Sequence, residues 1–185
     1  MKSILLFCLL TTCSISISNG QKLLAEIGSE RNVYIIYYGQ TPTFEYDSVT
    51  TVHKGGGIDK GWKSSVMIDK ILKKMSKNKI KGDAIMFTSE NMTDAQVINF
   101  KKNDLTKPSV ELEKIENINL IYLEQRPLFE MEYVIAVESP KFIKNWRTKT
   151  LKKIMLKKAL GQQKKFNILH FKEDDLWQAD LYITK

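Results

Sequence analysis

Hydrophobic and polar residues follow two different periods along the chain, and this predicts a mixture of β-strands and α-helices. Residues 32–38 and 117–123 are rich in β-branched and aromatic side chains, as is typical of strands. Apolar residues that recur every four positions among lysines predict an amphipathic helix over residues 64–77. They are Met67, Ile68, Ile71, Leu72 and Met75.

A second amphipathic helix is predicted in the basic stretch between residues 141 and 165. Its apolar stripe is expected to comprise Ile143, Trp146, Thr150, Ile154 and Leu151 or Met155. Asp59 is the candidate N-cap of the first helix, which ends before Gly82-Asp83. Short or alternating apolar runs predict further strands at residues 48–53, 84–88, 95–100, 132–138 and 179–184. Together these elements predict an α+β fold.

The predicted elements occur twice in the same order. Residues 32–46 match residues 117–131 without a gap, and seven of these fifteen positions are identical. The identical pairs are Asn32/Asn117, Ile36/Ile121, Tyr37/Tyr122, Gln40/Gln125, Pro42/Pro127, Phe44/Phe129 and Glu45/Glu130. One residue is lost in the next loop, after which Trp62 matches Trp146 and Lys101 matches Lys185. Such self-similarity predicts two tandem β-β-α-β-β copies, each an antiparallel sheet with one helix on one face.

The repeat also divides the chain. The expected divisions are a signal peptide at residues 1–20, a lead-in at 21–31, copy one at 32–101, a linker at 102–116 and copy two at 117–185. The lead-in is expected to be helical, and the linker is polar and contains Pro108. A unit of about 70 residues buries only about three-fifths of its unfolded surface. The two copies are therefore expected to pack against each other.

The N-terminus has the features of a signal for export. A short positive start precedes an apolar run at residues 4–12, and the small residues Ser18 and Gly20 suit cleavage before Gln21. Cys8 and Cys13 are the only cysteines, so the mature chain has no thiol for a disulfide. We expect a periplasmic or secreted protein. The alternative is a lipid anchor on Cys13, whose surroundings are similar to a bacterial lipobox.

Copy one carries short motifs found in a group of envelope domains. Its first strand ends in Tyr37-Tyr38-Gly39, Pro42 and Phe44-Glu45 follow, and Gly82-Asp83-Ala84-Ile85 precedes a short apolar strand. In these motifs the copy resembles the small envelope domains of the RcsF stress-sensor lipoproteins and of the YbjQ-type heavy-metal-binding proteins. The resemblance implies a small α+β domain with a non-catalytic role in the envelope. The disulfides of the RcsF-type domains have no counterpart here.

The residues with catalytic or metal-binding chemistry are few. His53 matches Glu138, and His170 matches Met86, so neither histidine recurs in both copies. Zinc and copper sites need several converging N, S or O ligands, and two isolated histidines do not provide them. No Ser-His-Asp order, nucleophile elbow or HExxH motif is present. Gly55-Gly56-Gly57 is interpreted as a flexible loop. We therefore expect no catalytic residue, no metal and no cofactor.

Two polar pairs are shared by both copies and are candidate binding residues. Gln40/Gln125 and Glu45/Glu130 occupy the same corner of each copy. They either accept hydrogen bonds from the neighbouring loop, as turn residues commonly do, or line a ligand groove between the copies. In an alternative hypothesis Glu45 and Glu130 form the centre of an enzyme active site between the copies.

The second helix suggests a binding surface. The net charge is +8, and residues 141–165 contain ten Lys or Arg and no Asp or Glu. Lys152, Lys153 and Lys157 are candidates for contact with an anionic envelope surface or an acidic protein. Nucleic acid fits the charge but not the expected compartment, and a solvated lysine face is the alternative. The sequence favours an exported, non-catalytic binding or sensing module of unknown ligand, with an enzyme or a purely structural surface protein as alternatives.

Overall fold

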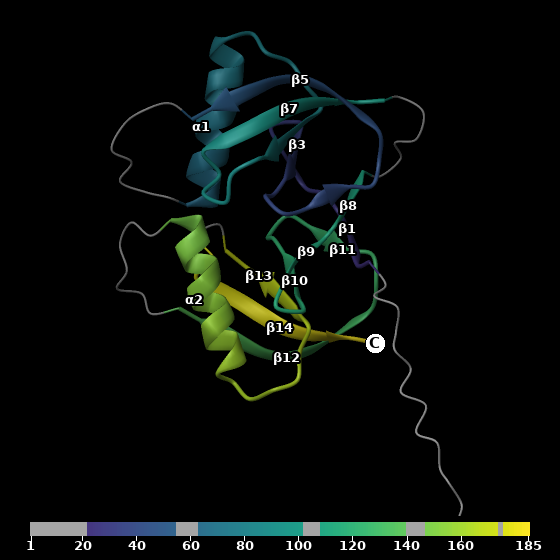
Figure 1. The fold of residues 1–185 in the computed structure, drawn as a ribbon, viewed down its shortest axis with the longest axis vertical. Helices are drawn as coiled ribbons and strands as arrows, with labels where there is room; N and C mark the ends of the chain where they lie inside the picture. Colours follow the sequence, from purple (N-terminus) through teal and green to yellow (C-terminus); the bar gives the residue numbers. More distant parts are fainter. Residues whose placement is uncertain (1–21, 55–62, 102–107, 140–146, 174–175) are drawn as a thin grey trace, which may run out of the picture.

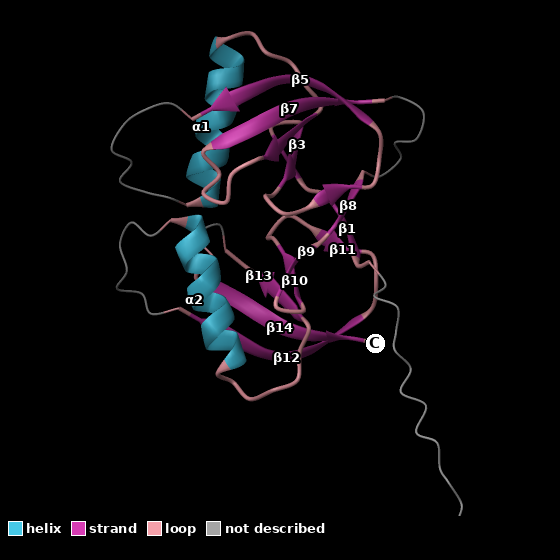
Figure 2. Cartoon of the chain, viewed as in Figure 1, coloured by secondary structure: helices cyan, strands magenta, loops and turns pink. Residues whose placement is uncertain are grey.

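The structure, a computed structural model, describes residues 22–54, 63–101, 108–139, 147–173 and 176–185. Within these ranges the chain forms two helices and three sheets in which antiparallel pairing dominates (Figures 1 and 2). The predicted α+β class is confirmed. Several predicted features lie outside the described residues. They are the signal peptide, Cys8, Cys13, the glycine run, Asp59, Trp62, Ile143 and Trp146.

The first half of the described chain, residues 22–101, contains a five-stranded sheet covered by one helix. The strand order is β2 (Ser29–Glu30), β3 (Val33–Ile36), β6 (Ala84–Phe87), β7 (Asp94–Phe100) and β5 (Tyr46–His53), with α1 (Ser64–Lys77) between β5 and β6 in sequence. The expectation of a wholly antiparallel sheet is wrong at one pair, because β3 and β6 are parallel. The chain runs back through α1 before β6, so β6 begins at the same end as β3.

The second half, residues 108–185, has a sheet with the corresponding order. Its strands are β9 (Glu113–Ile115), β10 (Ile118–Ile121), β13 (Ile168–Phe171), β14 (Gln178–Thr184) and β12 (Met131–Glu138), with α2 (Thr148–Leu160). Its parallel pair is β10 with β13. Both sheets begin with a two-residue hairpin in which Asn32 and Asn117 have φ of 63° and 66°. Asparagine tolerates this left-handed conformation, which explains its presence in both hairpins.

A third sheet joins the two halves. Its order is β11 (Arg126–Pro127), β1 (Leu24–Glu26), β8 (Ser109–Glu111) and β4 (Thr41–Pro42), and every pair is antiparallel. The first strand of the first half, β1, therefore pairs with β11 of the second half. In the same way β8, the first strand of the second half, pairs with β4 of the first half. The two prolines lie in the edge strands, where a missing N–H group is tolerated.

The strands of the third sheet also cover the back of the larger sheets. Ala25 of β1 packs in a cluster with Ile121 and Ile168 of the second half. Val110 of β8 packs in a cluster with Ile36 and Ala84 of the first half. The exchange of strands is thus accompanied by an exchange of apolar contacts. Both helices lie on the opposite side, end to end along the molecule (Figure 1).

These strands correct two expectations about the segments between the copies. The helix expected over residues 21–31 is wrong for the described part, which forms β1 and β2. The segment 102–116 was expected to be a polar linker, but residues 109–111 and 113–115 form β8 and β9. Three- and two-residue strands are too short to show a period, so their partners in the other half are needed to define them.

The helix stripes differ in how well they were predicted. The five apolar residues expected to face the core in α1 are all buried, as predicted. In α2 the buried residues are Thr148, Leu151, Lys152, Met155, Leu156 and Ala159, whereas the predicted Thr150 is exposed. Leu151 and Met155 are buried as predicted and Ile154 is half-buried, whereas Lys152 and Leu156 are buried although the predicted stripe did not include them. Met67 of α1 and Met155 of α2 belong to one continuous apolar cluster, so the two halves share a core.

Candidate functional site

The two shared glutamines meet at the centre of the molecule. Gln40 Nε2 donates to Gln125 Oε1 over 2.8 Å, and Gln125 Nε2 donates to Gln40 Oε1 over 2.7 Å. Each side-chain carbonyl also accepts the backbone N–H of its own turn, that of Tyr37 at 3.0 Å and that of Tyr122 at 3.1 Å. Both glutamines are buried, and this four-bond arrangement is related by an approximate twofold axis. The geometry matches a structural role in the turns.

The two shared glutamates are not brought together. Glu45 and Glu130 are exposed residues just before β5 and β12, which belong to different sheets. Their backbone carbonyls accept the N–H groups of Lys101 and Lys185, and Lys101 Nζ lies 3.6 Å from Glu45 Oε2. Among the described residues no hydrogen bond or ion pair joins the two carboxylates.

A buried charged cluster lies beside the glutamines, and within the described ranges its ion pair belongs to the second half. Lys152 Nζ donates to both oxygens of Glu113 at 2.8 and 2.9 Å, and the Tyr122 hydroxyl donates to Glu113 Oε2 at 2.7 Å. The side chains of Lys152 and Glu113 are 3% and 8% exposed, so the pair is shielded from water. Burial, followed by the negative charge of Glu113, raises the pKa of Tyr122 well above its usual value. Tyr122 therefore remains a neutral donor.

An aromatic stack connects this cluster to the first half. The rings of Tyr37 and Tyr122 are parallel within 5°, with centroids 4.0 Å apart. The ammonium of Lys152 lies 5.8 Å from the ring centroid of Tyr38, close enough for a cation–π contact. Lys152 was predicted as part of an exposed basic surface, but it is a buried residue held by Glu113 and these rings.

The first half has glycine at two positions where the second half has glutamate, and this difference explains why the described structure has one such cluster. The 85-residue correspondence extends to β1 and β8 and pairs Gly28 with Glu113 and Gly39 with Glu124. A Cβ atom on Gly39 would lie 2.7 Å from Glu113 Cγ, and one on Gly28 would lie 2.2 Å from Glu124 Cβ. Each contact therefore contains one glycine and one glutamate, in opposite halves. Only Glu113 forms an ion pair with a buried lysine in the described structure.

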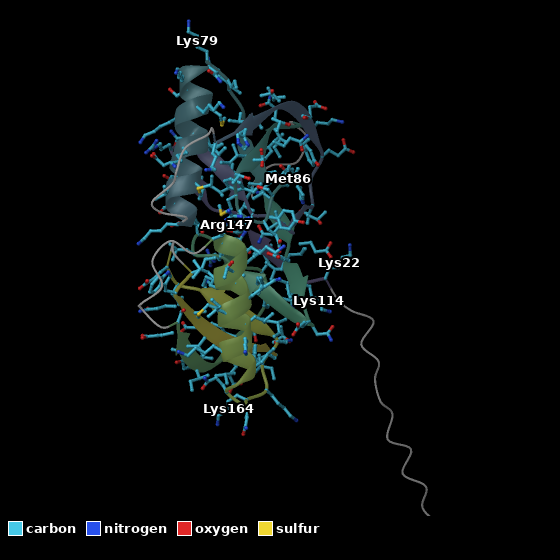
Figure 3. All side chains as sticks on the ribbon, turned by 60° about the vertical axis from the view of Figure 1, so that its left-hand side comes forward. Lys22, Lys79, Met86, Lys114, Arg147 and Lys164 are labelled. Atoms are coloured by element: carbon cyan, nitrogen blue, oxygen red, sulfur yellow. The ribbon has the colours of Figure 1, made fainter. Side chains whose placement is uncertain are left out.

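A cavity of about 650 Å³ opens above this cluster, between α2 and the β9–β10 hairpin. The helix lines it with an outer row of Lys149, Lys153 and Lys157 and an inner row of Lys152, Leu156 and Leu160. Residues four positions apart lie on the same face of a helix, so each row is continuous. The hairpin contributes Glu113, Ile115 and Glu116, and Glu90 comes from the first half. Figure 3 shows Arg147, at the start of α2, next to the first half and Lys164 at the far end.

The charges around the cavity are only partly neutralised. Lys149 Nζ lies 2.5 Å from Glu90 Oε2, and this hydrogen bond raises the pKa of Lys149. Lys152 is neutralised by Glu113. Lys153 and Lys157 are exposed, and neither forms an ion pair with another described residue. The outer rim is therefore positively charged, whereas the inner row consists of the neutralised Lys152 and two leucines.

The matched surface of the first half is occupied by ion pairs. Asp69, which matches Lys153, lies 2.5 Å from Arg31 Nη2 and 2.6 Å from Lys73 Nζ. The hydrogen bond from Lys73 lowers the pKa of Asp69. Ile68 and Ser76 stand at the positions matched to Lys152 and Leu160. The two helices have therefore diverged, and the row of three lysines is a property of α2.

The histidines lie apart from the cavity. His53 Nδ1 lies 2.5 Å from Asp94 Oδ1, and the pKa of Asp94 is lowered chiefly by a hydrogen bond from the Thr93 hydroxyl. His170 in β13 is different, because both ring nitrogens are buried without a hydrogen-bond partner in the described structure. Burial and the charge of Lys172, opposed by Asp180, lower the pKa of His170 to about 4.

The sequence predicts some of the residues that line the cavity. Lys153 and Lys157 were candidates and line the cavity, but Glu113 was placed in the linker and Tyr122 was considered only as a shared strand residue. A usable signal was present in the repeat itself. At two matched positions the first half has an uncharged residue and the second half has a charged one. The pairs are Gly28/Glu113 and Ile68/Lys152, and the two new charges are opposite in sign.

No protein-family model, no curated protein and no solved structure matches this chain. Within the described ranges neither helix has the length and apolar character that crossing a membrane requires. Those ranges also contain no group of three or more His, Cys, Asp and Glu side chains that could hold a metal ion. The distinctive chemical feature of the described surface is the cavity beside α2.

Removing the buried cation should destabilise the fold. Lys152→Met is expected to lower the free energy of unfolding by about 3–5 kcal/mol, because Glu113 remains buried without its partner. The double variant Lys152→Met/Glu113→Gln should recover most of the loss, since an amide carries no charge and still accepts the Tyr122 hydroxyl. Urea denaturation measures all variants. Lys153→Met is the matched control on the exposed neighbour, and an equal loss in that variant would contradict the buried pair.

His170 should make stability depend on pH. Its pKa is about 4 in the folded chain and 6.5 in the unfolded chain, so between these values the unfolded chain binds more protons. The free energy of unfolding therefore falls as the pH drops from 6.5 to 4. His170→Met, which introduces the residue of matched Met86, should reduce this fall by about 1–2 kcal/mol in denaturation experiments. His53→Gln is the control, and an unchanged slope in His170→Met would refute the assignment.

Proposed function

We propose that this chain is an exported, non-catalytic binding module of the cell envelope and that the cavity beside α2 is its ligand site. The main support for this proposal is the composition of the cavity wall. The cavity of about 650 Å³ combines a row of lysines with the apolar side chains of Leu156 and Leu160. This size is within the range of small-molecule sites, which are mostly apolar with a few polar groups that orient the ligand.

The charge of the rim selects the class of ligand. Lys153 and Lys157 are one helical turn apart and point to the same side, so they present two ammonium groups to one anionic group. Carboxylates, phosphates and sulfates accept such charge-assisted hydrogen bonds. We therefore infer an anionic ligand with an apolar part. This extends the expected role of the basic helix from a flat surface to a concave site.

The proposed architecture is a pair of tandem β-β-α-β-β copies of which only the second keeps the site. Matching strand orders, matched hairpins and the exchanged strands β4 and β11 support descent from one repeated unit. The export and envelope parts of the proposal rest on the N-terminal leader and on the resemblance to the RcsF and YbjQ-type domains. A lipid anchor at Cys13 is the alternative to free export.

Export has a direct test. Intact-mass analysis of the protein isolated from fractionated cells of its source is expected to give a chain that begins at Gln21, in the periplasm or the medium. A lipid-modified chain beginning at Cys13 in the membrane fraction would replace free export with anchoring. A full-length chain retaining Met1 in the cytoplasm would refute both versions.

The lysine rim also has a test that needs no knowledge of the natural ligand. Anilinonaphthalene sulfonate, a fluorescent aromatic anion, is expected to bind with one-to-one stoichiometry in fluorescence titrations. Lys153→Gln/Lys157→Gln should weaken its binding about tenfold, equivalent to about 1.4 kcal/mol. The control Lys77→Gln/Lys81→Gln removes the same charge from exposed positions of the first half. Equal weakening in both double variants would reduce the effect to net charge and contradict a site on α2.

A further inference from the structure

A second hollow adjoins the cavity beside α2. It has a volume of about 330 Å³ and shares two lining residues with the first cavity, Glu116 and Leu160. It continues past the C-terminal end of α2, between the helix end and the start of β10. The two hollows are neighbours along α2 and around its C-terminal end, and we refer to the pair as the groove.

Apolar side chains line both parts of the groove, and the buried Lys152–Glu113 ion pair lies at the base of the first part. Leu156 and Leu160 line the first part, and Ile118, Phe166 and Ile183 line the second. Leu160 lies where the hollows meet, and its side chain is 49% exposed. An apolar strip bordered by charged residues is typical of a binding surface.

Cations border the apolar floor on the solvent side. Lys153 and Lys157 stand over the first hollow, and Lys164 and Lys165 stand over the second. Glu116 is the one acidic residue at the junction of the two hollows that forms no ion pair within the described structure. The groove therefore combines cations at its rim with apolar side chains inside it, which is the complement of an anion with a hydrocarbon chain.

We propose that the groove binds one single-chain anionic amphiphile as a free monomer. This inference rests on the proposed function and specifies its ligand class. The acidic headgroup lies between Lys153 and Lys157, and the hydrocarbon chain passes Leu160 into the second hollow. From Lys153 to Leu160 the helix spans about 10 Å, and the second hollow extends beyond Leu160. This length suits an extended alkyl chain better than a compact anion.

Concavity favours a monomer over a bilayer surface. A lipid bilayer meets a protein at a protruding face, where lysines reach headgroups and apolar residues insert between them. Here the apolar residues line hollows, and only a chain separated from its bilayer can enter. The first half offers a comparison, because Asp69 and Ser76 stand at the positions of Lys153 and Leu160 and remove both the charge and the apolar contact.

The test uses dodecanoate below its micelle concentration, titrated into the full mature chain by calorimetry. One-to-one binding is expected, with acetate failing because it lacks the chain and dodecyltrimethylammonium failing because its charge is reversed. Leu160→Ser introduces the residue of matched Ser76 and should weaken dodecanoate binding about tenfold. Leu128→Ser is the control, since Leu128 is equally exposed, at 50%, but lies outside the groove.

The outcomes separate this inference from the proposed function. If anilinonaphthalene sulfonate binds through Lys153 and Lys157 but dodecanoate does not bind, the anion site stands and the amphiphile inference is overturned. Equal weakening by Leu160→Ser and Leu128→Ser also overturns it. Binding to phosphatidylglycerol vesicles without binding to monomeric dodecanoate would assign the lysines to a membrane surface and overturn the inference. If neither anion binds, both proposals fall.

Discussion

The fold depends on one constraint, which is that neither half can complete its own core. Each half has about 80 residues, and residues 22–185 contain no cysteine that could form a disulfide to compensate for a small core. The four-stranded central sheet meets this constraint by pairing β1 with β8 and giving each an edge strand from the other half. The apolar contacts are exchanged in the same way, because Ala25 and Val110 cover the opposite halves. Folding of one half therefore requires the other.

The centre of this arrangement is polar but fully hydrogen bonded. Gln40 and Gln125 bond to each other and to the turns that carry them, so they leave no unpaired carbonyl at the approximate axis. A buried polar group costs free energy only when it lacks partners. Next to this symmetric pair the two halves differ, because Gly28 and Gly39 of the first half match Glu113 and Glu124 of the second. Glu113 packs against Gly39, and its carboxylate neutralises Lys152 at the base of the cavity.

Prediction from the sequence succeeded where the pattern was long and the environment simple. The strands β3, β5, β7, β12 and β14 and the apolar stripe of α1 follow from local periodicity. Prediction failed where a partner decides the environment. Lys152 was assigned to solvent because an isolated lysine avoids burial, and only the contact with Glu113, 39 residues earlier in the chain, makes burial possible.

The sequence by itself determined the α+β class, the internal repeat and the lysines of the second helix, because these depend on composition and on neighbours within a few residues. Only the tertiary structure decided which of those lysines is buried, where the short strands pair and how the cavity forms. The physical reason is distance along the chain. Glu90, Glu113 and Leu160 meet at one cavity only after the strands have been exchanged and the two sheets have closed on a shared core.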